Sequence, residues 1–443
     1  MKRTTKIIFF LTLFVIGRMM FDLSSCVNDD QIIEPTQSNN QTDLISLVAS
    51  TPPTIDGVVD EMWQSAKKLE TVTQVPDPGN GLFAGYIGKQ YPIAIRSMYD
   101  GSNIYFLAEW SDPTNSVQVQ PWYFNPTTKR WTQEPSAKTF DANGALTRDG
   151  WGEDKLAMLW NIDKSTAKFA SQTCYASCHV FTPYLNPVTN TMVPNQSANH
   201  YTNGANEKID MWWLKIGRDP IHSQFSDEYQ DWAGGPAYSS IAGGSANGRH
   251  QDDQVPSGSF NANYPYAPTY TANAANTGTS NNTQSLAITG SVPEVKVNVP
   301  KYIIPAKTNY YYILLSEVND GTAKIVTAVD AEGVLTLSDG STITPGADYQ
   351  RAGDAITGGH GSKVVPSYIS APLTNGRADI TCIAIYTGSG WVVEWKRALK
   401  TTGTLKQDVD FSALADEPFG VAIFDKSNYQ HAIKPNLLLK FSK

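Results

Sequence analysis

Short apolar runs separated by turn residues recur along this chain, and they restrict it to a fold built from β-strands. Segments 100–103 (DGSN), 339–341 (DGS) and 387–390 (TGSG) are typical turn sequences. Because the apolar runs are only about five to seven residues long, they favour strands over helices. The runs are 92–98, 104–108, 156–160, 310–315, 391–395 and 420–424. The pattern predicts an all-β fold, an antiparallel β-sandwich with long loop insertions and few short helices.

Helical signals are few, and the segment from Asp60 to Leu69 is the best short candidate. A stretch at about 234–292 contains a region rich in Gly, Ser, Asn, Ala and Tyr without periodicity. We expect it to be a long surface insertion rather than a domain. The predicted organisation is a signal peptide at 1–25, a flexible tether at 26–44 and one sandwich domain at 45–443.

The N-terminus is typical of a bacterial lipoprotein signal peptide. Basic residues lie within the first six positions, and the apolar run 7–16 is too short to span a bilayer comfortably. Segment 23–26 (LSSC) resembles a lipobox, in which Cys26 would receive the lipid. An ordinary secretory signal with a coincidental cysteine is the alternative. We expect an exported protein, lipid-anchored in the bacterial cell envelope on the periplasmic or cell-surface side of the outer membrane.

The segment 174–179 (CYASCH) indicates a specific chemistry. Two cysteines followed by a histidine are the arrangement that attaches haem c, with the histidine as proximal iron ligand. The usual spacing is C-x-x-C-H, whereas Cys174, Cys178 and His179 have one residue more between the thiols. A disulfide or half of a metal site are the alternatives, although a disulfide needs no neighbouring histidine.

Composition excludes several other classes. The formal net charge of −8 argues against nucleic-acid binding, which needs a basic surface. With Cys26 set aside, three cysteines remain, too few for a disulfide scaffold, and Cys382 lies in an apolar run typical of a buried thiol. The sequence contains no G-x-S-x-G, H-E-x-x-H or phosphate-loop motif. We therefore expect an electron-transfer protein rather than an enzyme, although it could be a subunit of an oxidoreductase.

Several segments together resemble the ethylbenzene dehydrogenase-type haem-binding domain, which is related to family 9 carbohydrate-binding modules. Each motif is short, and their order along residues 45–443, leaving out the insertion, carries the resemblance. The segments are 54–63 (TIDGVVDEMW), 99–106 (YDGSNIYF), 110–113 (WSDP), 153–156 (EDKL), 210–215 (DMWWLK), 376–380 (GRADI), 390–394 (GWVVE), 397–399 (RAL) and 419–425 (FGVAIFD).

The resemblance implies a haem held at one end of a β-sandwich. In the family's haem b members a methionine and a lysine are the axial ligands. By position, the resemblance implies that His179 replaces the methionine and His431 the lysine, with Lys434 as the alternative sixth ligand. The chain thus resembles a c-type branch of the family, with one haem c. Other residues weighed as ligands are Met98, Met158, Met211, His200, His222, His250, His360 and Lys215.

The sequence predicts an extracytoplasmic monohaem c-type cytochrome that transfers electrons between redox partner proteins of the cell envelope, with a lipid anchor as its contact with the membrane. One alternative is a haem-free sandwich lipoprotein that binds carbohydrate or another surface ligand. A further alternative is the haem subunit of a molybdenum dehydrogenase. Calcium is a second candidate cofactor, because acidic pairs such as Asp252-Asp253 are either solvated surface or calcium ligands.

Overall fold

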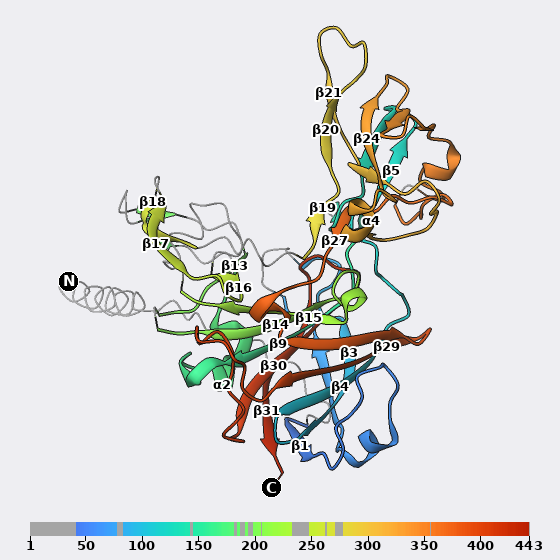
Figure 1. The fold of residues 1–443 in the computed structure, drawn as a ribbon. Coiled ribbons are helices and arrows are strands. Elements are labelled where there is room, and N and C mark those ends of the chain that lie inside the picture. Colours follow the sequence, from blue (N-terminus) through green and yellow to red (C-terminus); the bar gives the residue numbers. More distant parts are fainter. Residues whose placement is uncertain are drawn as a thin grey trace, which may run out of the picture. The chain divides into compact units, whose positions relative to one another are not determined.

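The computed structural model consists almost entirely of β-strands and loops (Figure 1). It describes residues 41–77, 83–141, 145–180, 184–186, 191–193, 198–204, 206–232, 248–261, 264–270, 278–354 and 356–442. For 179–180, 184–186, 192–193, 198–199, 256–261 and 264–270 only the backbone is described. The prediction of an all-β sandwich with few short helices is confirmed.

Twelve strands form one large sheet. They are β1 (Asp43–Val48), β2 (Leu69–Gln74), β3 (Gln90–Tyr99), β4 (Asn103–Ser111), β9 (Lys155–Asn161), β14 (Ile209–Lys215), β15 (Gln224–Gln230), β16 (Arg249–Gln251), β28 (Ile380–Tyr386), β29 (Gly390–Ala398), β30 (Glu417–Phe424) and β31 (Ala432–Phe441). Along the sheet the order is β1-β3-β2-β31-β30-β9-β14-β15-β28-β29-β4, with β16 beside β15. Of the expected runs, 92–98, 104–108, 156–160, 391–395 and 420–424 lie in these strands.

The sheet folds into two layers that meet at narrow junctions. We call β31-β30-β9-β14-β15 the cavity layer and β2-β3-β4-β29-β28 the opposite layer. Strands β15 and β28 pair at two positions only, and β2 pairs with β31 at one. Strand β1 pairs in parallel with both β3 and β31, which joins the layers on that side. Except for β1, the paired strands of the large sheet run antiparallel.

Large aromatic side chains fill the space between the layers. Trp160 and Phe419 stack within the cavity layer at 4.9 Å between ring centroids, and Phe106 stacks on Trp395 in the opposite layer at 5.2 Å. Phe106 also meets Trp212 across the core at 5.7 Å. Successive residues of a strand face opposite sides, so every second residue of each central strand enters this core. The need to fill this aromatic core explains the apolar runs that mark the strands in the sequence.

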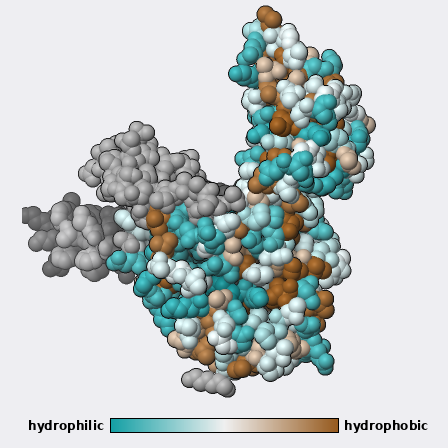
Figure 2. All heavy atoms as spheres, viewed as in Figure 1, coloured by the Kyte–Doolittle hydropathy of each residue, from teal (hydrophilic) through white to brown (hydrophobic). Residues whose placement is uncertain are grey.

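A second group of small sheets has a hydrophobic core of its own, which the sequence analysis did not anticipate. Trp122, Trp131, Val326, Leu335 and Val365 are central to it, and all are at least 95% buried. Its strands are β5 (Trp122–Asn125), β6 (Arg130–Gln133), β19 (Ser280–Asn281), β20 (Gln284–Ala287), β21 (Lys296–Val299), β22 (Tyr302–Ile303), β23 (Ile313–Leu314), β24 (Lys324–Val329), β25 (Leu335–Leu337), β26 (Thr342–Ile343) and β27 (Tyr368–Ser370). The hairpin β20–β21 carries hydrophobic side chains at its tip (Figure 2), where Val292 is 95% exposed.

The remaining elements are short. Two-stranded pairs are β7 (Thr139–Phe140) with β8 (Leu146–Arg148), β10 (Cys178–Val180) with β13 (Ala198–His200), β11 (Tyr184–Asn186) with β12 (Thr191–Val193), and β17 (Pro256–Asn261) with β18 (Tyr264–Tyr270). The helices and 3-10 turns are η1 (Glu61–Ser65), η2 (Ile162–Lys164), α2 (Phe169–Gln172), η3 (Thr173–Ala176), η4 (Pro220–His222), α4 (Leu315–Asn319), η5 (Ala347–Tyr349) and η6 (Asn375–Ala378).

Two expectations about local structure need correction. The helix expected from Asp60 to Leu69 is a single 3-10 turn at η1, because the chain becomes extended at Ala66 and enters β2 at Leu69. The strand expected at 310–315 is limited to β23, because α4 begins at Leu315. Within the predicted insertion, β16 joins the large sheet beside β15, while 233–247, 262–263 and 271–277 lie outside the described residues.

Candidate functional site

A cavity lies against the face of the cavity layer that points away from the aromatic core. Its volume is about 80 Å³, below the range of about 300–1,000 Å³ usual for ligand pockets. The lining residues are Ala157, Leu159, Cys174, Ser177, Cys178, His200, Met211, Trp213, Gln230, Arg249, Gly420, Val421, Ala422, Phe424, His431, Ile433 and Lys434. The resemblance implied a haem at one end of the sandwich, whereas this cavity lies on the outer face of one layer.

The floor of the cavity consists of two rows of side chains that cross three strands. Gly420, Leu159 and Met211 form one row, because both Gly420 and Met211 pair with Leu159. Ala422, Ala157 and Trp213 form the next row in the same way. These positions alternate with core residues such as Met158 and Trp160, which are fully buried. Because glycine and alanine project little above the sheet, the centre of the floor is low and flat.

The segment that carries the two cysteines packs closely onto this floor. A Cβ atom on Gly420 would lie 2.4 Å from Cγ2 of Thr173, so only glycine permits the approach. The Thr173 hydroxyl accepts a hydrogen bond of 2.9 Å from the backbone N–H of Asn436 in β31. Asn436 sits at a β-bulge with φ of 62°, a conformation that asparagine tolerates. Thr173 therefore fixes η3 against the strands β30 and β31.

Cys174 and Cys178 both line the cavity, and the structure has them as free thiols. Burial raises the pKa of the Cys178 thiol to about 11 and raises that of Cys174 as well. At neutral pH both groups are thus protonated. The two sulfur atoms present S–H groups to the same enclosed space.

His179 and His200 lie in the short pair β10–β13. The backbone of His179 pairs with Asn199, and the side chain of His179 lies outside the described residues. His200 is directly opposite Cys178 in this ladder, and its Nε2 is 4.0 Å from Cys178 Sγ. The sequence analysis weighed His200 as a ligand that could reach the haem from the loop after the cysteine motif; its place beside Cys178 depends on the β10–β13 pairing.

His431 reaches the same cavity from the loop between β30 and β31. Its Nδ1 donates a hydrogen bond of 2.7 Å to the carbonyl of Tyr429. Because a carbonyl can only accept, this contact places the ring hydrogen on Nδ1 and leaves the lone pair on Nε2. The ring stacks on Phe424 at 4.7 Å between centroids. Burial lowers the pKa of His431, which favours the neutral imidazole that binds metal.

Lys155 anchors the loop that carries His431. Its ammonium group is buried and donates to the carbonyl groups of Ser427 and Asn428 at 2.8 and 2.9 Å. The same group lies 5.1 Å from the centroid of the Phe424 ring. Burial lowers the pKa of Lys155 to about 7. These contacts hold the loop and the aromatic ring on which His431 stacks.

Further polar groups surround the cavity. Lys434, the alternative ligand, is 9% exposed and lines the cavity near His431 in the chain. Arg249 from β16 lies 4.1 Å above the Trp213 ring, and its Nε is 3.8 Å from a carboxylate oxygen of Glu228. The sequence analysis missed Arg249, because only the pairing of β16 with β15 brings it here. Both cations are suited to pairing with carboxylates of a bound ligand.

The other residues weighed as ligands lie elsewhere, except Met211 on the floor and His200. Met98 and Met158 are core residues. His222 contacts the Ser370 hydroxyl at 2.9 Å, His250 contacts Asp231 at 3.1 Å, and His360 packs on Trp151. Lys215 pairs with Glu228 at 3.0 Å. Cys382 is fully buried in the main core, as expected.

Cys26 and the whole predicted signal peptide at 1–25 lie outside the described residues, as does the tether up to residue 40. Among the residues that the structure describes, none belongs to a helix long and apolar enough to cross a membrane. The predicted export and lipid anchor therefore stay predictions from the sequence.

Comparison with solved structures finds similarity to a family 9 carbohydrate-binding module from Caldicellulosiruptor kristjanssonii. The module in complex with cellotriose is 8% identical, with 90% of this chain and 93% of that chain covered and a TM-score of 0.26. The same module in complex with glucose is 9% identical, with 90% of this chain and 95% of that chain covered and a TM-score of 0.25. Similarity at this level carries no conclusion about ligands. No curated protein matches the chain.

Comparison with protein families gives a match that covers most of the chain. The family described as ethylbenzene dehydrogenase matches residues 60–434. This range includes every strand of the large sheet except β1 and most of β31, together with both cysteines and His431. It agrees with the family resemblance carried by the ordered motifs of the sequence. The chain belongs to the ethylbenzene dehydrogenase family.

Proposed function

We propose that this protein is a monohaem c-type cytochrome that transfers single electrons between redox partners of the cell envelope. In this proposal the haem occupies the cavity of the cavity layer and is attached through Cys174 and Cys178. His179 and His431 are its axial ligands. The assignment of His179 comes from the sequence motif, since its side chain lies outside the described residues.

The observation that supports the proposal most is the meeting of two free thiols and a neutral imidazole in one cavity. Cys174 and Cys178 come from the segment that covers the floor, and His431 comes from a loop about 250 residues later. The donor set matches haem c, which needs two thiols and nitrogen ligands. The low floor of Gly420, Ala422 and Ala157 offers a flat surface for a macrocycle. The segment over the floor would have to move outward to admit it, because the cavity of about 80 Å³ is smaller than a haem.

The residues of the chain have distinct tasks in this proposal. The backbone carbonyl of Tyr429 holds His431 in the tautomer whose Nε2 can bind iron. Arg249 and Lys434 supply positive charge for the propionate groups. Apolar walls such as Phe424 and Trp213 exclude water. Bound haem supplies one-electron redox chemistry, and two imidazole ligands leave no open coordination position, which favours electron transfer over reaction with small molecules.

The cellular setting of the proposal comes from the sequence. A lipobox-like segment ending at Cys26 gives an exported, lipid-anchored protein, and haem c is attached outside the cytoplasm. Redox partner proteins of the envelope are the proposed electron donors and acceptors. A role as the haem subunit of a larger oxidoreductase is the variant of this proposal that the family membership allows.

The carbohydrate-binding alternative would need aromatic side chains on open surface. All eleven tryptophans of the chain lie in the described residues, and none of them is exposed. Eight of them are more than 95% buried, in the cores of the sandwich and of the smaller sheets. This distribution favours the cytochrome over a carbohydrate-binding module.

The test is production of the exported chain together with a haem c maturation system, followed by haem staining after denaturing electrophoresis. We expect the wild-type chain to keep its haem and the double variant Cys174→Ser/Cys178→Ser to lose it. Cys382→Ser is the matched control, because this thiol lies in the core, and it should stain like wild type. The single variants report whether one or both thioether bonds form. An unstained wild-type chain that is folded would refute the cytochrome and favour the haem-free alternative.

A further inference from the structure

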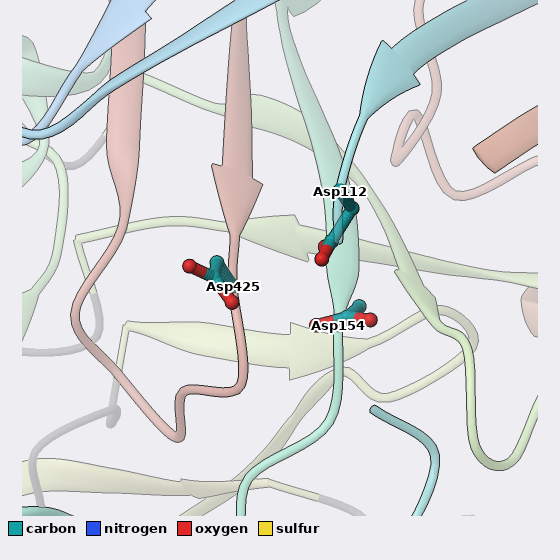
Figure 3. A group of neighbouring side chains, drawn as sticks. All are labelled: Asp112, Asp154 and Asp425. Carbon is teal, nitrogen blue, oxygen red and sulfur yellow. The ribbon is translucent and has the colours of Figure 1, made fainter. Parts of the chain in front are cut away.

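Three aspartates from distant parts of the sequence meet at the ends of strands. Asp112 directly follows β4, Asp154 directly precedes β9, and Asp425 directly follows β30. One carboxylate oxygen of each lies within 4.8 Å of those of the other two. Figure 3 shows the carboxylate of Asp112 directed towards Asp154, with Asp425 beside them on the neighbouring strand end. None of the three lines the cavity described above.

Hydrogen bonds hold most of the carboxylate oxygen atoms of this group in place, and one buried oxygen is an exception. Asp154 accepts from the backbone N–H groups of Ser116 and Lys426 at 2.9 and 2.8 Å and from Trp391 Nε1 at 3.1 Å. Asp425 Oδ2 accepts from the Tyr91 hydroxyl at 2.8 Å.

Asp112 supplies the exception. Its Oδ1 accepts two hydrogen bonds from Thr114, at 2.9 Å from the backbone N–H and 3.0 Å from the hydroxyl. Its Oδ2 is buried and has no hydrogen-bond partner among the described residues, and the whole residue is 0% exposed. A buried carboxylate oxygen without a partner is unfavourable, so this atom points to a ligand that is not part of the chain.

No basic side chain balances the group. Among the ion pairs of the described residues, none includes Asp112, Asp154 or Asp425. Two lysines adjoin the group in the sequence, and both have other partners. Lys426 pairs with Asp149, and Lys155 donates to the carbonyl groups of Ser427 and Asn428. A second group of three aspartates shows the contrast: Asp210, Asp227 and Asp408 are equally close together, but Arg397 lies among them at 2.9, 3.8 and 3.4 Å.

We propose that Asp112, Asp154 and Asp425 bind a Ca²⁺ ion. Carboxylate oxygens are the ligands that hard divalent cations prefer, and a cation would remove both the mutual repulsion and the unsatisfied oxygen of Asp112. Ca²⁺ is proposed rather than Mg²⁺, because it tolerates ligands that come from separate strand ends, whereas Mg²⁺ demands near-ideal octahedral geometry. Ca²⁺ accepts six to eight oxygens in irregular geometry, and water can complete its shell.

The ion would also join three parts of the sandwich. It links the end of β4 in the opposite layer to β9 and β30 in the cavity layer. Asp425 begins the loop that leads to His431, and Asp154 precedes Lys155, which anchors the same loop through Ser427. The metal site itself does not depend on haem, and the proposal stands or falls separately from the cytochrome.

The test is calorimetric titration of the chelator-treated full chain with CaCl₂, paired with terbium luminescence. Trp391 donates a hydrogen bond to Asp154, so excitation of tryptophan should sensitise Tb³⁺ bound at this site, and Ca²⁺ should displace it. The luminescence is measured on chain produced without haem maturation, because haem would quench it. Asp112→Asn should weaken Ca²⁺ binding at least about tenfold, since it removes one of three charged ligands. The matched control Asp408→Asn should bind like wild type, because Arg397 occupies that group.

Three outcomes would overturn the proposal. They are absence of Ca²⁺ binding by the folded wild type, unchanged binding by Asp112→Asn, and displacement of Tb³⁺ by Mg²⁺ as readily as by Ca²⁺. If Asp112→Asn fails to fold, the thermal stability of the wild type decides. Chelator should lower its melting temperature, and Ca²⁺ but not Mg²⁺ should restore it; a melting temperature indifferent to both would refute the site.

Discussion

The two faces of the cavity layer are made by alternate residues of the same strands, yet they differ in almost every respect. The inner face carries Trp160, Trp212 and Phe419, which are fully buried; Trp160 stacks on Phe419 and packs against Trp212. The outer face carries the small side chains of Ala157 and Ala422, and a cavity lies over them instead of a packed core. One face therefore holds the fold together, and the other provides room for a ligand. Substitutions on the two faces should separate stability from cofactor binding.

The largest expected effect is the loss of an inner-face tryptophan. Trp160→Ala should lower the free energy of unfolding by about 3–5 kcal/mol, because it leaves a large void in the aromatic core. Leu159→Ala, one residue earlier on the outer face, should lower it by only about 1 kcal/mol. Guanidinium unfolding monitored by tryptophan fluorescence measures both. Equal losses for the two variants would break the distinction between the faces.

Filling the floor of the cavity should reduce haem attachment and leave the fold in place. Ala422→Phe should reduce the haem covalently bound after maturation by at least about tenfold, because the ring occupies the space above the floor, while the fold is kept. The matched control is Ala94→Phe, since Ala94 is a half-buried alanine in β3 of the opposite layer. Haem absorbance per chain and circular dichroism measure the two effects. Normal haem content in Ala422→Phe would place the cofactor elsewhere.

Removal of His431 should change the iron environment without removing the covalently attached haem. His431→Ala opens one coordination position, so the Soret band should shift and the ferric haem should become able to bind added ligands. Lys434→Leu is the control, because Lys434 lines the same cavity and is the alternative ligand, and leucine cannot bind iron. If Lys434→Leu changes the spectrum and His431→Ala does not, Lys434 is the axial ligand.

The smallest effect concerns an acidic residue at the edge of the inner face. Glu417 is the first residue of β30 and lies on the same face of the strand as Phe419. Burial raises the pKa of its carboxyl from 4.5 to about 7, although the Lys164 ammonium at 4.0 Å lowers it. Since the folded state keeps this proton and the unfolded state releases it, stability should fall as pH rises from about 4.5 to 7.

Glu417→Gln should remove that slope, and Glu70→Gln, an exposed residue of β2, should leave it in place. Urea midpoints measured on both sides of the pH window check this. A slope that persists in Glu417→Gln would assign it to another group.

The sequence was sufficient for the strands of the sandwich, because their apolar runs face a thick core. It also singled out Cys174, Cys178 and His431, which the structure brings to one cavity. Export, the lipid anchor and the ligand role of His179 stay predictions.

What the sequence could not provide depends on strand pairing. Ala157 and Ala422 are unremarkable residues until the register places them side by side. The position of the cavity on a face of the sandwich follows from that register. The second core, and the meeting of Asp112, Asp154 and Asp425, depend on contacts between segments that are far apart in the chain.

The central claim is that the cavity holds one haem attached through Cys174 and Cys178. The most direct measurement is the intact mass of the wild-type chain after maturation, taken under denaturing conditions that strip non-covalent ligands. A mass equal to the processed polypeptide plus one haem is the predicted result, with the addition mapped to the peptide that contains 174–178. The mass of the bare polypeptide, obtained from folded protein, would contradict the claim.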